Sequence, residues 1–113
     1  KKVGLLGTKY TMEGDFYKNR IEKNYGIDVI IPDSKDRNLT HRIIYEELVS
    51  GILKDSSKEK FKEIILDLEE KGAEGVILGC TEIPLLVKAE DSNLPIFNTT
   101  ELHAKKAVEY SLE

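Results

Sequence analysis

Four short, mainly apolar runs interrupt a chain that is otherwise rich in charged residues. They lie at Val3–Gly7, Ile27–Ile31, Val76–Gly79 and Pro95–Phe97. Apolar runs of this length, without regular polar alternation, are typical of strands buried on both faces, as in a parallel sheet. The pattern therefore predicts four strands.

The segments between these runs have the spacing of amphipathic helices. After Thr11, we expect Met12, Phe16 and Ile21 to share one buried face, whereas the polar, aperiodic stretch 33–38 predicts a loop. Thr11 and Ser57 suit the N-cap position of two helices. The predicted helices run from Thr11 to near Gly26, from Leu39 to Ile52, from Ser57 to Lys71, from Glu82 to Lys88, and from Thr99 or Thr100 onward.

The order of these elements, βαβααβαβα, predicts an α/β fold with three layers, α/β/α, around a four-stranded parallel sheet. We expect the flavodoxin-like strand order 2-1-3-4 with right-handed crossovers. In that order the chain reverses direction between the first and third strands, where ligands of open α/β sheets bind. Thr8 follows the first strand and Cys80 the third, so the prediction brings them to one crevice.

Composition narrows the class of protein. The 113 residues suit one domain, and a net charge of -4 argues against a nucleic-acid-binding surface. A single cysteine excludes an internal disulfide and fits the cytoplasm. No apolar stretch reaches the roughly 20 residues of a membrane-spanning helix, so no membrane partner is expected.

Cys80, Thr81 and Glu82 form the strongest candidate for chemistry. They stand directly between a predicted strand and a predicted helix. A thiol acts as a nucleophile or base only as the thiolate, and a helix N-terminus is expected to lower its pKa. Each residue also has a purely structural explanation. A lone cysteine is more often a buried core residue, Thr81 could simply be a helix N-cap, and Glu82 could be an ordinary acidic residue in the first turn of the helix. Their succession at a strand end favours function.

Thr8 and Thr11 are candidates for binding an anion through hydroxyl and backbone N–H groups, with simple helix capping as the alternative. The Gly4–Thr8 stretch lacks the third glycine of a dinucleotide fingerprint, and it is no Walker loop. His41 and His103 are the only histidines, and neither belongs to a cluster with metal-ligand spacing. We therefore expect no metal. His41 lies where it could reach over the crevice.

Four ordered stretches carry a family resemblance. Gly79–Pro84 is similar to the second-cysteine motif of the aspartate/glutamate racemase family. Three others agree with that family in order and spacing: Gly4–Thr8 with Thr11 and Met12, His41–Leu48, and Pro95–Thr100 with Leu102–Ala104. The resemblance covers nearly the whole chain. It is closest to aspartate racemases and to broad-specificity amino-acid racemases that need no pyridoxal phosphate.

The resemblance implies that residues 1–113 are the C-terminal domain of a two-domain racemase whose N-terminal domain is absent from this chain. In such an enzyme one cysteine removes the α-proton of aspartate or glutamate, the opposite cysteine returns one, and no cofactor takes part. Roles follow by position. Cys80 resembles the second acid/base residue, Thr8, Thr11 and Thr81 resemble ligands of the substrate carboxylate, Glu82 resembles a supporting carboxylate, and His41 resembles a helix residue directed to the cleft.

This resemblance carries further expectations. The chain alone should be inactive, because one thiol cannot perform two-base racemisation. The apolar face of the last predicted helix suggests self-association, as a homodimer. Asn98 stands where many relatives have aspartate, which weakens any role for that side chain.

Other functions stay open at this point. One is a relative of the same superfamily that acts on a hydantoin or a maleate-type diacid. Another is a non-catalytic domain that binds a small dicarboxylate or amino acid. A third is a flavodoxin-like mononucleotide binder that uses the Thr8 loop.

Overall fold

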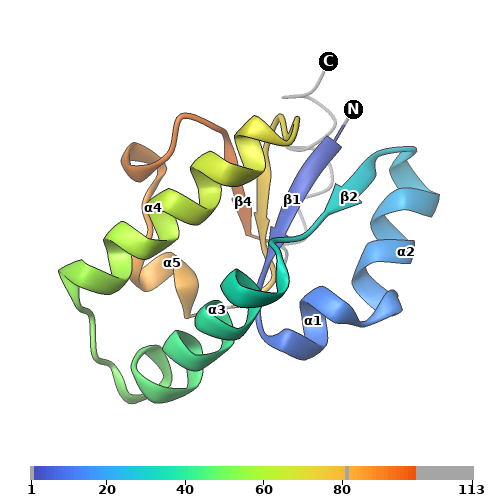
Figure 1. Ribbon diagram of the computed structural model, residues 1–113. Coiled ribbons are helices and arrows are strands. Elements are labelled where there is room, and N and C mark those ends of the chain that lie inside the picture. The colour runs from blue at the N-terminus through green and yellow to red at the C-terminus, as the bar shows by residue number, and fades with distance from the viewer. Residues whose placement is uncertain (1, 81, 99–113) are drawn as a thin grey trace.

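The computed structural model describes residues 2–80 and 82–98, which form one parallel sheet with helices on both faces (Figure 1). The strands are β1 (Lys2–Leu6), β2 (Asp28–Ile30), β3 (Val76–Leu78) and β4 (Ile96–Asn98). All pairings are parallel, and the strand order is β2-β1-β3-β4. The predicted fold class and strand order are confirmed. Thr81 and the predicted last helix lie outside the described residues.

Seven helical segments connect or flank these strands within the described part of the chain. They are α1 (Lys9–Glu13), α2 (Asp15–Tyr25), α3 (Ser34–Glu46), η1 (Leu48–Ser50), α4 (Asp55–Glu70), α5 (Ile83–Leu86) and η2 (Ala89–Asp91), where η denotes a 3-10 turn. Among the described residues, no helix combines the length and the apolar composition that crossing a membrane requires.

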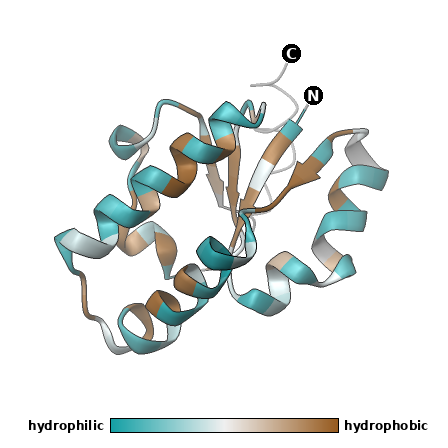
Figure 2. Ribbon diagram, in the orientation of Figure 1, coloured by the Kyte–Doolittle hydropathy of each residue, from teal (hydrophilic) through white to brown (hydrophobic). Residues whose placement is uncertain are grey.

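The two faces of the sheet bury different sets of apolar side chains. On one face, Leu6 and Leu78 pack into a cluster with α3, α4 and α5, including Ile44 and Phe61. On the other face, residues such as Leu5 join a smaller cluster that includes Ile21 of α2 and Val29 of β2. Figure 2 shows the apolar strands between helices whose outer surfaces are mostly hydrophilic. Burial on both faces explains why the strands lack regular polar alternation.

The first helical stretch differs from its prediction. Thr8, not Thr11, is the N-cap of α1, because its Oγ1 accepts the backbone N–H of Thr11 at 3.3 Å. Gly14 ends α1, and a Cβ at this position would lie only 2.6 Å from the carbonyl oxygen of Tyr10. The break separates two helices where one was expected. As a result, Phe16 is 71% exposed, and its assignment to the buried face of Met12 was wrong.

The predicted loop at 33–38 is also wrong, because α3 begins at Ser34. Asp33 is its N-cap, with Oδ1 accepting the backbone N–H of Asp36 at 2.9 Å. An aspartate N-cap is a strong local start signal that hydrophobic spacing does not detect. At its other end α3 stops at Glu46, and Gly51 adopts a left-handed conformation with φ of 79°. Ile52 therefore lies outside the helix and is 42% exposed.

The start of α4 and the bounds of α5 also differ from the sequence-based predictions. Lys54 is the N-cap of α4, and Ser57 lies inside that helix. Ser57 is 5% exposed, and its hydroxyl donates to Glu47 Oε1 at 2.6 Å instead of capping α4. The stretch predicted as helix from Glu82 to Lys88 forms a single turn, α5, with proline in its first positions.

Candidate functional site

The carboxyl ends of β1 and β3 meet at two glycines. Leu6 and Leu78 are register partners, and the Gly79 N–H donates to the Leu6 carbonyl at 2.7 Å. Thr11 lies against this junction. A Cβ at Gly79 would be 2.9 Å from Thr11 Cγ2, and one at Gly7 would be 3.1 Å from the same atom. Glycine at both positions therefore lets α1 pack directly on the ends of the two strands.

This packing brings two predicted binding residues to the end of β3. The Thr8 and Thr11 hydroxyl oxygens are 3.2 Å apart on the first turn of α1, and both side chains are partly buried. Thr11 contacts Gly79, the residue before Cys80. The first and third strand ends thus converge, as the strand order predicted.

Cys80 and Glu82 form a direct pair at the end of β3. Cys80 is 7% exposed, and its Sγ–H donates to Glu82 Oε2 at 2.8 Å. Glu82 occupies the N-cap position of α5 but makes no side-chain capping hydrogen bond. Its carboxylate is used by the thiol instead. Thr81, between them, lies outside the described residues.

The environment of Cys80 raises the pKa of its thiol. Burial is the largest cause, and the hydrogen bond to the Glu82 carboxylate and the charge of that group raise the pKa further. Hydrogen bonds from the backbone N–H groups of Glu82 and Ile83 lower the pKa, but they do not outweigh burial and the adjacent carboxylate. The expected lowering by the helix N-terminus was therefore wrong. A four-residue helix offers little positive potential against burial and an adjacent carboxylate.

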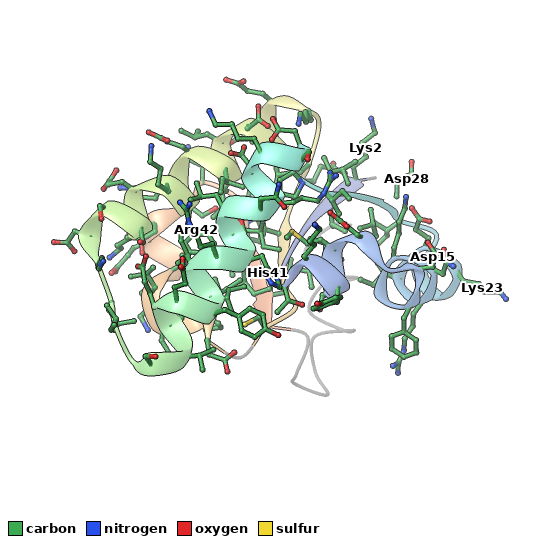
Figure 3. All side chains as sticks on the ribbon, turned by 60° about the horizontal axis from the view of Figure 1, so that its bottom comes forward. Lys2, Asp15, Lys23, Asp28, His41 and Arg42 are labelled. Carbon is green, nitrogen blue, oxygen red and sulfur yellow. The ribbon has the colours of Figure 1, made fainter. Side chains whose placement is uncertain are left out.

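His41 lies at the same edge, on the face of α3 that meets α1 (Figure 3). Its Nδ1 accepts the backbone N–H of Lys9, the first residue of α1, at 2.9 Å. Two tyrosine rings flank the imidazole. The ring of Tyr10 lies edge-on at 5.7 Å between centroids, and the ring of Tyr45 is tilted at 4.6 Å.

Sequence reasoning missed these two tyrosines. Tyr45 follows His41 by four residues on one helix, and that spacing places both on one helical face. This signal was available. Tyr10 meets His41 only because α1 packs on α3, which no local pattern shows.

A second polar cluster lies at the N-terminus of α3. Carboxylate oxygens of Asp33, Asp36 and Asp67 lie within 4.8 Å of one another, which is close enough to hold a cation. Lys71 Nζ pairs with Asp67 at 3.0 Å, and Asp33 is the α3 cap. Burial, followed by the charges of Asp33 and Asp67, raises the pKa of Asp36. Capping and ion pairing account for these contacts, so they do not assign a metal.

Comparison with known proteins identifies the family to which this chain belongs. Residues 1–107 match the model of the Asp/Glu/Hydantoin racemase family. The chain belongs to this family. The resemblance carried by the four sequence motifs is thereby confirmed.

Solved structures and curated relatives agree with this assignment. The structure of a Yersinia pestis protein grouped with the Asp/Glu racemases shares 50% identity and a TM-score of 0.85, over 99% of this chain and 49% of that one. An aspartate racemase homologue from Pyrococcus horikoshii shares 43% identity and a TM-score of 0.81, with the same coverage. A glutamate racemase from Persephonella marina is 29% identical over 93% of this chain and 40% of its own length. The chain thus spans about half the length of these relatives.

Proposed function

We propose that this chain is one half of a cofactor-independent amino-acid racemase for aspartate or glutamate, and that Cys80 is one of its two acid/base residues. The observation that carries the proposal is the Cys80–Glu82 hydrogen bond of 2.8 Å at the junction of β1 and β3. A carboxylate that contacts a buried thiol, and makes no capping bond, provides a place for the thiol proton.

The raised pKa gives Cys80 the proton-donor role in the resting site. A base on the other half removes the α-proton from one face of the substrate. Cys80 then gives its proton to the α-carbon from the opposite face, so that the S–H bond breaks as the new C–H bond forms. In the reverse direction the Cys80 thiol first passes its proton to the Glu82 carboxylate, and the resulting thiolate takes the α-proton. The first transfer leaves the net charge of the pair unchanged, because thiolate with carboxylic acid carries the same charge as thiol with carboxylate.

The three predicted threonines supply the substrate contacts in this proposal. The Thr8 and Thr11 hydroxyls, which are 3.2 Å apart, are suited to donate to the substrate carboxylate, and Thr81 is proposed to do the same. Donors held in place by folding cost little reorganisation during the reaction. Glu82 serves the Cys80 thiol, and His41 lies beside the two threonines through its contact with Lys9.

The greater length of the relatives supports a second domain in the full-length protein. Because the chain spans 49% of two solved relatives, we infer an N-terminal domain that supplies the opposing cysteine. The chain by itself should then be inactive. A cytoplasmic location and a homodimeric assembly belong to the same proposal. A light-scattering mass equal to a single polypeptide across the concentration range would exclude the homodimer.

Deuterium exchange at the α-carbon of aspartate and glutamate tests the proposal. We expect the full-length protein to exchange the α-proton of both enantiomers in D2O, and Cys80→Ser to lose exchange mainly with one enantiomer. Thermal unfolding of both proteins controls for misfolding. Unchanged exchange of both enantiomers in Cys80→Ser would refute the role of Cys80.

One alternative has a specific observation in its favour. The matching family is described by hydantoin as well as aspartate and glutamate, so a hydantoin is the second candidate substrate. Repeating the exchange assay with a substituted hydantoin separates the two. Calorimetric binding of a dicarboxylate without any exchange would indicate a non-catalytic binding domain instead.

A further inference from the structure

The helix α1 depends on anchors outside itself. It has five residues, and isolated helices of this length are unstable in water. Met12 anchors it to the core, with 1% of its surface exposed, and the Thr8 side chain caps it. The third anchor is the contact from His41 Nδ1 to the Lys9 N–H. This contact is made at the first residue of α1, next to Thr8.

The chemistry of the imidazole restricts what His41 can do. A ring nitrogen that accepts a hydrogen bond carries no proton, so the proton of the neutral ring lies on Nε2. The Nδ1 lone pair is occupied by the Lys9 amide, and the Tyr10 and Tyr45 rings contact the imidazole. These contacts are all within the domain.

A chain of contacts connects Lys9 to the end of β3, where Cys80 lies. Thr8 precedes Lys9 and shares a hydrogen bond between hydroxyls with Thr11. Thr11 in turn lies against Gly79, and the following residue is Cys80. A displacement of the first turn of α1 would therefore move both threonine hydroxyls relative to the end of β3.

We propose that His41 is a positioning residue, which fixes the first turn of α1 through Nδ1 and thereby places the Thr8 and Thr11 hydroxyls beside Gly79 and Cys80. The inference rests on the proposed function, because those hydroxyls are the groups proposed to meet the substrate. It differs from a direct substrate contact, in which Nε2 of His41 would be the functional atom.

Two substitutions separate these roles. His41→Asn places an amide oxygen near the position of Nδ1, and can still accept the Lys9 N–H. His41→Gln places its amide near the position of Nε2 and leaves the Lys9 N–H without that acceptor. If His41 is a positioning residue, the asparagine variant should retain more function than the glutamine variant. If His41 contacts the substrate through Nε2, the glutamine variant should retain more. Arg42→Gln is the matched control on α3, because the Arg42 side chain is 66% exposed and forms a surface ion pair with Glu46 at 3.5 Å.

The first readout is nuclear magnetic resonance of the full-length protein. In the wild type we expect nitrogen shifts of the Nε2–H tautomer for His41 and a downfield Lys9 amide proton. His41→Gln should move that amide proton upfield, and His41→Asn should largely preserve it. An Nδ1–H tautomer, or a Lys9 amide that does not respond to His41→Gln, would overturn the proposal.

The second readout is KM in the α-proton exchange assay. We expect His41→Gln to raise KM by about 3- to 10-fold, the equivalent of one net hydrogen bond, and His41→Asn to raise it less. Thr11→Val retains the methyl group beside Gly79 but removes the hydroxyl. In that background His41→Gln should raise KM by a smaller factor, because only the Thr8 hydroxyl is left to position, whereas simply additive effects would overturn positioning. A wild type without exchange would refute the proposed function, and the tautomer and amide signals would still decide the positioning contact.

Discussion

The helices α3 and α5 both begin at a carboxylate, and the two carboxylates are used differently. At α3, Asp33 Oδ1 accepts the Asp36 N–H at 2.9 Å and caps the helix. At α5, Glu82 occupies the N-cap position without a side-chain capping bond, and its Oε2 accepts the Cys80 thiol at 2.8 Å.

The lengths and first residues of the two helices explain part of this contrast. The 13-residue α3 has a full first turn of N–H groups to satisfy, and a side-chain cap serves it. The four-residue α5 has Pro84 in its first positions, and proline has no N–H. Glu82 is therefore not required as a side-chain cap, and its Oε2 accepts the thiol hydrogen bond. The two helix starts look alike in sequence, and only the hydrogen-bond partners distinguish the capping Asp33 from the thiol-bound Glu82.

The largest expected effect is on catalysis. Glu82→Gln should lower α-proton exchange by the full-length protein by about 100-fold or more, because glutamine cannot hold the thiol proton. The matched change at the other helix, Asp33→Asn, should leave exchange within about twofold, since asparagine still caps α3. Equal losses in the two variants would remove the functional distinction between these carboxylates.

The next effect concerns the junction that places Cys80 beside α1. Gly79→Ala should destabilise the protein by about 1–3 kcal/mol through overpacking, because its Cβ would be 2.9 Å from Thr11 Cγ2. Denaturant unfolding measures the change. Thr11→Ser removes the opposing methyl group and should restore part of the lost stability in the double variant. If the stability losses of the two single variants simply add in the double variant, the clash is not with the Thr11 methyl group. It would then lie elsewhere, for instance at Leu5 Cδ1, 3.4 Å from the same Cβ.

A smaller effect separates capping from pairing. Asp33→Ala should be about 1 kcal/mol less stable than Asp33→Asn, which keeps the cap without the charge. At α5 we expect Glu82→Ala and Glu82→Gln to differ less in stability, because neither loses a cap. Thermal unfolding of the four variants provides the comparison. A stability difference between the two Glu82 variants as large as that between the two Asp33 variants would contradict this expectation.

The smallest effect is a dependence of stability on pH. Because folding raises the pKa of Cys80, the folded state keeps the thiol proton to a higher pH than the unfolded chain does. This contribution is full below the ordinary thiol pKa of about 8.5 and is lost as pH rises through the folded value. Unfolding free energies measured across this range should fall less steeply for Cys80→Ser than for the wild type. Parallel curves would show that the thiol does not contribute.

Local sequence determined much of this protein. Four apolar runs without regular polar alternation specified the buried strands, and their order specified a parallel sheet in which the ends of β1 and β3 meet. The succession from Gly79 to Glu82 pointed to the end of β3 as the candidate site, and four ordered motifs indicated the racemase family. These features follow from short-range patterns, because burial on both faces and chain order leave few other arrangements.

The tertiary structure decided how the side chains at that edge are used. It assigned the α1 cap to Thr8, left Glu82 to the thiol and occupied His41 Nδ1 with a backbone amide. It also reversed the expected shift of the Cys80 pKa, because burial and an adjacent carboxylate outweigh the N-terminus of a single-turn helix. Desolvation and hydrogen bonding depend on which groups packing brings within a few ångströms, and spacing along the chain does not contain that information.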